Sequence, residues 1–263
     1  MTASHKPASH SHESDHVCWG AGKEHVQHHR LEVSNLGVSY REVVALDGIN
    51  LATECGRSLA LVGPNGGGKS TLLKTLAGLL KPDVGMVRWR GQPLTQSSRE
   101  IAYLPQRSDV DWKFPITVRG LVEMGRYPNL GWWKSYRQHD ADIVERALAA
   151  MRLQDLQHRQ ISALSGGQQQ RAFIARALAQ EAHVLLLDEP FTGLDGPAQE
   201  NLEVLFKDLS HEGRLLIASH HDLSTVGRIF DEVLLISRQQ FAFGPVQEVF
   251  TPECVARTYG RTS

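Results

Sequence analysis

The sequence predicts an α/β fold, in which a mostly parallel sheet carries an antiparallel β portion and an inserted helical subdomain. Short apolar runs such as SLALVG and VLLLDEP alternate with segments that have helical leucine spacing. This alternation is typical of a mainly parallel sheet that is covered by helices on both faces. Residues 107–165 carry helical patterns that are broken only by turn residues, and this predicts the insertion.

Size and composition allow one sizeable domain and exclude several classes of protein. The chain has 263 residues, 41% of them hydrophobic, and it balances 28 basic against 29 acidic residues. A nearly neutral chain shows neither a nucleic-acid footprint nor a basic anchor for anionic lipid, so no nucleic-acid partner is expected. No apolar stretch approaches the roughly 18 residues that span a bilayer. Any membrane crossing is therefore expected from another polypeptide.

The beginning of the chain and its cysteines indicate a cytosolic protein. The first residues, MTASHKPASHSHESDH, are polar and lack the apolar core of a signal peptide, so secretion is not expected. Cys18, Cys55 and Cys254 are odd in number and far apart. They form no metal-type or redox pair, which favours reduced thiols.

Residues 1–29 differ in composition from the rest of the chain and are expected to form a flexible tail. They contain seven of the 13 histidines and few branched apolar residues. The histidines of the tail are His5, His10, His12, His16, His25, His28 and His29. Two interpretations stay open, because the spacing matches no closed structural site: weak binding of Zn²⁺ or a similar ion, together with Cys18, or a polar tail without a role.

The first part of the folded region has strand patterns around one helix. Strands are expected at 31–40, 49–54, 58–63, 86–91 and 101–106. The leucines of STLLKTLAGLL have helical spacing, and this helix is expected to stop at Lys81–Pro82, since proline cannot continue a helix.

The inserted segment and the last third of the chain also have helix and strand patterns. Within the insertion, DADIVERALAAM is the clearest helix, with Asp140 as its expected N-cap, and turns are expected at Pro128, Asn129 and Gly131. Further along, helices are expected at 168–180, at 199–209 and, as a short helix, near Leu223, with strands at 184–190, 214–219 and 232–237.

The motif GPNGGGKS fits a phosphate-binding loop directly between an apolar strand and a helix. Glycines let successive N–H groups point inward around a phosphate, and the following helix adds the positive end of its dipole. Lys69 can reach the β- and γ-phosphates, and the Ser70 hydroxyl can bind Mg²⁺. The expected nucleotide contacts are Gly63, Pro64, Asn65, Gly66, Gly67, Gly68, Lys69, Ser70 and Thr71. The alternative is a glycine-rich turn with a chance lysine.

The run VLLLDEP ends in two acids where a buried parallel strand delivers groups to a ligand. Asp188 is expected in the shell of Mg²⁺, and Glu189 is expected to polarise the water that attacks the γ-phosphate. The alternative is a strand that ends in a solvated acidic turn.

A second anion cradle is expected at LSGGQQQR. Ser165, Gly166 and Gly167, followed by Gln168, stand at the start of a predicted helix, where a hydroxyl and free amides can hold a phosphate. Because one domain already has its own phosphate loop, this cradle is expected to serve a partner subunit's nucleotide. The alternative is an ordinary serine N-cap followed by two glycines.

Together these motifs resemble the ATP-binding subunits of ABC transporters, from about Leu31 to the C-terminus. The resemblance implies one ABC ATPase domain with a P-loop NTPase core. Its expected parts are the domain 30–263, with core segments 30–106 and 167–250, helical subdomain 107–166 and C-terminal segment 251–263.

The resemblance also assigns roles to four further residues. Tyr40 is expected to stack on adenine, Gln106 to sense the γ-phosphate and join the metal shell, and Asp195 to lie in the loop that crosses between subunits. His221 matches the switch histidine because it, and not His220, precedes Asp-Leu. The alternatives are a surface tyrosine, a turn glutamine, a helix N-cap aspartate and a solvated histidine.

The mechanism that the resemblance implies uses two copies of the chain. They are expected to dimerise head to tail and to trap two ATP molecules between one chain's Gly63–Ser70 and the other chain's Ser165–Gly167. One departure from the family is Gly67, where alanine is common, and it is expected to loosen the loop slightly.

The cargo is suggested by resemblance as well. Residues 108–133, together with DEPFTGLD and TPECVARTYG, are similar to the manganese and zinc branch of ABC importers. This implies an integral membrane permease, an extracytoplasmic solute-binding protein and a peripheral position on the cytoplasmic face of the membrane. Phe114, Trp132 and Trp133 form either local core or a docking surface for the permease. Iron-chelate or haem import, or a soluble ATPase such as the iron–sulfur assembly type, remain alternatives.

Overall fold

The computed structural model describes residues 29–94, 98–130 and 135–260. Apart from His29, the predicted flexible tail lies outside this part of the chain, and so do Gly131, Trp132 and Trp133. Within the described residues, no helix combines the length and the apolar character that crossing a membrane requires.

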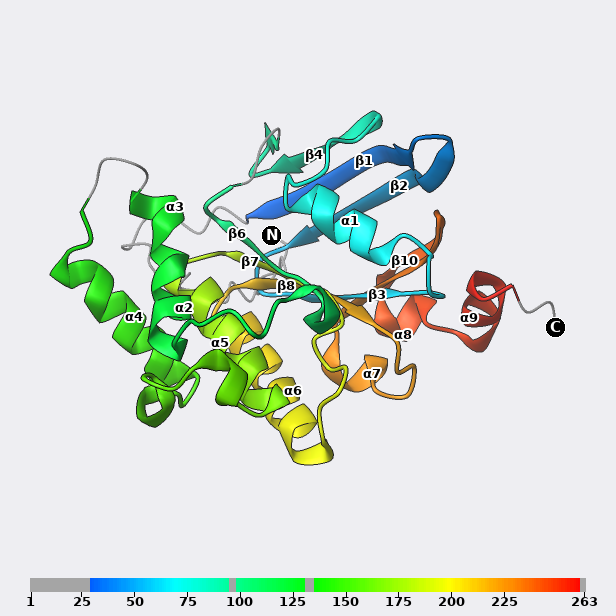
Figure 1. The fold of residues 1–263 in the computed structure, drawn as a ribbon. Helices are drawn as coiled ribbons and strands as arrows, with labels where there is room; N and C mark the ends of the chain where they lie inside the picture. The colour runs from blue at the N-terminus through cyan, green and yellow to red at the C-terminus, as the bar shows by residue number, and fades with distance from the viewer. Residues whose placement is uncertain (1–28, 95–97, 131–134, 261–263) are drawn as a thin grey trace, which may run out of the picture.

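The strands of the described residues form one ten-stranded sheet in the order β5-β4-β1-β2-β10-β9-β3-β8-β7-β6 (Figure 1). The strands are β1 Arg30–Tyr40, β2 Val43–Glu54, β3 Ser58–Val62, β4 Val84–Trp89, β5 Gln92–Pro93, β6 Ile101–Leu104, β7 Val184–Leu187, β8 Leu215–His220, β9 Glu232–Ser237 and β10 Gln239–Pro245. Strands β6, β7, β8, β3 and β9 pair in parallel, whereas β1, β2, β4 and β5 pair antiparallel. The predicted α/β class with an antiparallel portion is confirmed.

Helices cover both faces of the sheet (Figure 1). They are α1 Lys69–Leu76, α2 Val118–Glu123, α3 Tyr127–Leu130, α4 Gln138–Ala150, α5 Gly166–Ala179, α6 Gly196–His211, α7 Val226–Ile229, α8 Val246–Val249 and α9 Pro252–Thr258. Strand β3 shows the two layers, because its side chains alternate. Leu59 and Leu61 face the core that contains α1, while Ala60 and Val62 face the core that contains α5 and α6.

The helical segment shares its core with the sheet. Helices α2 and α4 both pack on α5, and their apolar side chains join the core that lies under the sheet. A buried ion pair between Arg126 and Asp140, 2.9 Å long, fastens the segment from α2 to α4, and Arg126 also contacts Glu181 beyond α5. The buried charges of Arg126 and Asp140 are matched. Through its second contact, with Glu181, Arg126 ties the insertion to α5, the helix that carries LSGGQ.

Several boundaries differ from the prediction. Helix α1 ends at Leu76 and not at Lys81–Pro82. The cause is Gly78, four residues before Pro82, because its φ of 71° turns the chain out of the helix. The short helix expected near Leu223 lies at Val226–Ile229 instead, after a turn. Strand β10 and the C-terminal helices α8 and α9 were not predicted, because their apolar residues have no clear period.

The N-terminus of α4 also corrects a prediction. The helix begins at Gln138, so Asp140 is the third helical residue and not the N-cap. Its carboxylate accepts the N–H of Arg137 at 3.0 Å while it pairs with Arg126, and both contacts stabilise the first turn. Pro128 and Asn129 do not break the chain into a turn but lie in the short helix α3, where proline is tolerated in a first turn.

Candidate functional site

The phosphate loop connects β3 to α1, as predicted, and its path requires glycine. A side-chain carbon at Gly63 would lie 1.8 Å from the carbonyl oxygen of Ile236. Gly68 has φ of 95°, and a side-chain carbon there would lie 2.6 Å from Leu46. A loop that only glycines can follow brings its backbone close to a ligand, which is the geometry that a phosphate cradle needs.

Gly67 is closely packed in this loop. A methyl group there would lie 2.9 Å from the carbonyl oxygen of Pro64. The Gly67 N–H donates to that same oxygen at 3.0 Å, and the Gly67 carbonyl accepts the N–H of Arg238 at 2.8 Å. The glycine therefore provides the room for a loop that is held from both sides.

Lys69 is buried, and its ammonium lies within the loop itself. The Nζ atom donates to the carbonyl oxygens of Gly63 at 2.8 Å and Pro64 at 3.0 Å. Burial lowers the pKa of Lys69, and the negative charges of Glu189 and Asp188 oppose this shift. A bound phosphate would give the cation a stronger partner than two neutral carbonyls.

A serine that was not predicted organises the two acids after β7. The Ser219 hydroxyl donates to Asp188 Oδ1 at 2.7 Å and accepts the N–H of Glu189 at 2.7 Å. Ser219 lies at the end of β8, which pairs in parallel with β7, so both strands deliver their last residues to one edge. Glu189 has φ of 48°, a left-handed conformation that a non-glycine residue rarely adopts and that is held here by this contact.

Gln106 and Glu189 are in direct contact. The Gln106 amide nitrogen donates to Glu189 Oε2 at 2.8 Å, and the Thr192 hydroxyl donates to the same oxygen at 3.2 Å. The carboxylate that is expected to polarise water thus lies next to the glutamine that is expected to sense the γ-phosphate.

A cavity of about 550 Å³ joins these elements. It is lined by the phosphate loop from Asn65 to Thr71, by Gln106 and Glu189, and by Tyr40, Val43 and Val44. The phosphate loop offers amides and a lysine, which fit a triphosphate, and Ser70, Gln106 and Asp188 offer the oxygen ligands that Mg²⁺ prefers. Tyr40 and the two valines are exposed, so they offer apolar surface for a base. The set of residues therefore fits a magnesium nucleotide.

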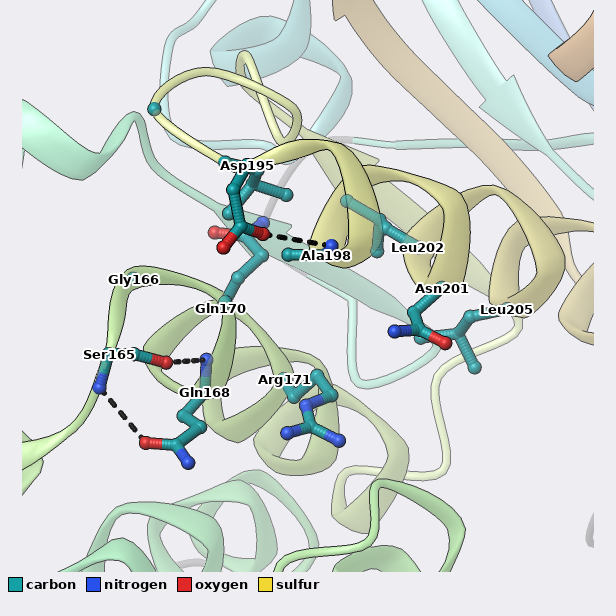
Figure 2. Close-up of a pocket in the computed structure, with 13 residues that line it drawn as sticks. Ser165, Gly166, Gln168, Gln170, Arg171, Asp195, Ala198, Asn201, Leu202 and Leu205 are labelled. Carbon is teal, nitrogen blue, oxygen red and sulfur yellow. Dashed lines mark hydrogen bonds between the residues drawn. The ribbon is translucent and has the colours of Figure 1, made fainter.

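The predicted second cradle lies apart from this cavity. Ser165 is the N-cap of α5: its side chain accepts the N–H of Gln168, whose side chain accepts the N–H of Ser165 at 2.9 Å (Figure 2). Asp195 is the N-cap of α6 and accepts the N–H of Ala198 at 3.0 Å. Both helix starts line a separate pocket of about 300 Å³. The capping role that the sequence allowed for both residues is present, and their helix starts line a different pocket from the chain's own phosphate loop.

The structure separates the two neighbouring histidines. His220 is 1% exposed, packs against Phe191 and Phe230, and lies 2.7 Å from the Thr225 hydroxyl, with a pKa that burial lowers to about 4. His221 is exposed, follows the end of β8 and does not line the cavity. A buried structural His220 supports the choice of His221 as the switch residue.

Phe114, for which two roles were open, is 58% exposed, so it does not belong to the core of the insertion. Sequence patterns also missed Arg238, which lines the nucleotide cavity from the turn between β9 and β10. No local motif marks this arginine.

The chain is similar to ATP-binding proteins of metal transport systems. The ABC transporter family profile matches residues 46–192. The manganese transport system ATP-binding protein MntB of Halalkalibacterium halodurans is 42% identical over 87% of this chain and 91% of its own length. The zinc transport system ATP-binding protein TroB of Treponema pallidum is 43% identical over 88% of this chain and 86% of its own length.

A solved structure of an ABC transporter is also similar to this chain. A metal-chelate type ABC transporter in an inward-facing conformation contains a chain that is 32% identical, with a TM-score of 0.78 and 88% of both chains covered. Sequence and fold therefore agree over most of the chain. This protein belongs to the ABC transporter family and is an ATP-hydrolysing subunit of it.

Proposed function

We propose that this chain energises an importer of divalent metal ions, manganese or zinc, by hydrolysing ATP. The observation that carries the ATPase part is the polar chain from Gln106 through Glu189 and Ser219 to Asp188, which lies beside the Lys69 ammonium. The metal is supported by the manganese and zinc systems that give the relatives MntB and TroB their names.

The polar side chains at and around the cavity have the following proposed parts in hydrolysis. Lys69 leaves the carbonyls of Gly63 and Pro64 and binds the β- and γ-phosphates. Ser70, Gln106 and Asp188 would hold Mg²⁺, which would supply positive charge against the charge that develops on the transferred phosphoryl group.

Glu189 is the proposed general base for the attacking water. Its Oε2 atom accepts hydrogen bonds from Gln106 and Thr192, which orient the carboxylate. His221, which follows β8, is proposed to contact the γ-phosphate. Tyr40 is proposed to stack on the adenine.

We also propose that two copies form the active unit. The starts of α5 and α6, with Ser165–Gly167 and Asp195, line a pocket apart from the chain's own nucleotide cavity. The free amides of a helix N-terminus can hold a phosphate, so this pocket is suited to a nucleotide carried by the second copy.

A permease is the proposed membrane partner, and it would place this chain on the cytoplasmic face of the membrane. A groove of about 550 Å³ runs between the segment after α1, strand β6 and helices α3 and α5. Leu79, which is 56% exposed, gives it apolar surface, and Arg99 and Arg176 give it positive charge. A helix of a permease could fill such a groove, and an extracytoplasmic solute-binding protein would deliver the metal to the other side.

Cellular metal content tests the cargo. In cells that lack this chain and are grown with limiting metal, we expect accumulation of manganese or zinc to fall. Wild-type protein should restore it, and Glu189→Gln should not. Normal manganese and zinc in the deletion strain would contradict the proposal.

Chelated metal is a second candidate, favoured by the metal-chelate type transporter that is 32% identical to this chain. The same strain separates the two candidates. Loss of growth on an iron chelate, with manganese and zinc unchanged, would support the second one.

A further inference from the structure

Arg238 lies at the nucleotide cavity but belongs to none of the predicted motifs. It occupies the tight turn between β9 and β10, is exposed to solvent, and lines the cavity on the side of the phosphate loop. Strand β10 begins beside β2, where Gln239 pairs with Asp47, and close to the loop that precedes α1 (Figure 1).

Backbone hydrogen bonds fix the position of Arg238 relative to the phosphate loop. Its N–H donates to the Gly67 carbonyl at 2.8 Å, and its own carbonyl accepts the N–H of Asp47 at 2.8 Å. The residue has φ of 60°, a conformation that costs free energy for any residue with a side chain. A turn that is strained and bonded on both sides holds its side chain in a defined place, next to the loop that would wrap the phosphates.

The guanidinium of Arg238 has no anionic partner in the described part of the chain. Glu189, the acid that also lines the cavity, is engaged by Gln106 at 2.8 Å. Asp47, the acid bonded to the same turn, accepts the Gln239 amide at 2.9 Å. Arg126, by contrast, is paired with Asp140. An unpaired cation therefore borders a cavity that is suited to a polyanion.

We propose that Arg238 is a further nucleotide-binding residue, whose guanidinium contacts the phosphate chain of ATP bound in the same subunit. The inference rests on the proposed function in so far as ATP occupies this cavity. The backbone of Arg238 is bonded to Gly67 of the phosphate loop, and this favours a phosphate contact over a contact with the base. A guanidinium binds phosphate with two parallel hydrogen bonds.

The test uses three variants of the full chain and a fluorescent ATP analogue. Arg238→Gln removes the charge but keeps a polar side chain and the backbone strain of the residue. We expect its Kd to rise about three- to tenfold, and to depend less on salt than the wild-type Kd, because a charge–phosphate contact is screened. Arg238→Lys keeps the charge and should recover most of the affinity.

Arg41→Gln is the matched control. Arg41 is also exposed, has φ of 57° in the turn between β1 and β2, and does not line the cavity. We expect its Kd to change less than twofold. Melting temperatures of all variants should stay close to that of the wild type, so that a change in Kd reports binding and not folding.

Three results would overturn this inference. One is an unchanged Kd in Arg238→Gln. Another is an equal loss in Arg41→Gln, which would indicate a general effect of net charge. The third is a loss of preference for ATP over GTP in Arg238→Gln, which would indicate a contact with the base. If the wild-type chain failed to bind the analogue, the proposed function would fail as well, whereas wild-type binding with an unaffected variant removes only Arg238.

Discussion

The Gln106 amide donates a hydrogen bond of 2.8 Å to Glu189 Oε2, across the gap between the loop after β6 and the loop after β7. The two residues are 83 positions apart in the sequence. They meet because β6 and β7 pair in parallel and end at the same edge of the sheet. The contact places the amide of the proposed γ-phosphate sensor against the carboxylate that is proposed to polarise water.

Glu189→Gln should bind ATP and hydrolyse it at least about a hundredfold more slowly, because the general base is lost while the phosphate loop is intact. The replacement amide keeps the size of the side chain and can still contact Gln106 and Thr192. Single-turnover hydrolysis and titration with an ATP analogue measure the two quantities separately. Hydrolysis near the wild-type rate would contradict the role of Glu189.

Lys69→Ala should lose nucleotide affinity by at least about tenfold, since a charge-assisted contact with phosphate is removed. The same change leaves the carbonyls of Gly63 and Pro64 without their donor. Titration of a fluorescent ATP analogue measures the loss. Lys74→Ala, on a partly exposed turn of α1, is a suitable control that should bind like the wild type.

The motifs and the sheet could be predicted because their signals are local. The glycine loop, the acids after VLLL and the cap at Ser165 each follow from a few neighbouring residues, and the structure places them on the elements expected. Long apolar runs such as β3 and β7 are buried on both sides, which makes their strand pattern plain.

Contacts that depend on tertiary packing could not be predicted. Ser219 reads as the last residue of a strand, and only the pairing of β8 with β7 brings it to Asp188. Asp140 looks like an N-cap, but pairing with Arg126 makes a position inside the helix favourable. Arg238 reaches the cavity only because β10 returns beside β2.

The second cradle predicts a dimer that depends on ATP. Glu189→Gln with ATP should elute as a dimer in size-exclusion chromatography, and Gly166→Asp in that background should remain a monomer, because a carboxylate at this helix start repels the partner's phosphate. A side-chain carbon at Gly166 would meet the end of the flexible Arg107 side chain at 2.6 Å, which can move aside.

Gly91→Asp provides the matched control for this dimer test. Gly91 has φ of 74° in the turn between β4 and β5, and a side-chain carbon there would meet nothing within 4 Å. This variant should still form the dimer, and both aspartate variants should bind the nucleotide in their own phosphate loop. A dimer of unchanged amount with Gly166→Asp would rule out Ser165–Gly167 as the contact.

His220 predicts a loss of stability in acid. Burial lowers its pKa from 6.5 to about 4, so the unfolded chain binds a proton in a range where the folded chain does not. The free energy of unfolding therefore falls as pH decreases from about 6.5 to about 4, by about 3 kcal/mol from this residue over the whole range. Urea denaturation of the wild type at pH 7.5 and pH 5 should show about 2 kcal/mol of this loss.

His220→Phe should be less sensitive to acid than the wild type, although it loses the contact with Thr225 and is less stable at pH 7.5. His29, whose pKa is also lowered to about 4, mainly by burial, leaves part of the acid response in place. His211→Phe, an exposed position at the end of α6, should keep the wild-type difference between the two pH values. If His220→Phe and the wild type lost the same free energy between pH 7.5 and pH 5, the buried His220 would not be the group that takes up the proton on unfolding.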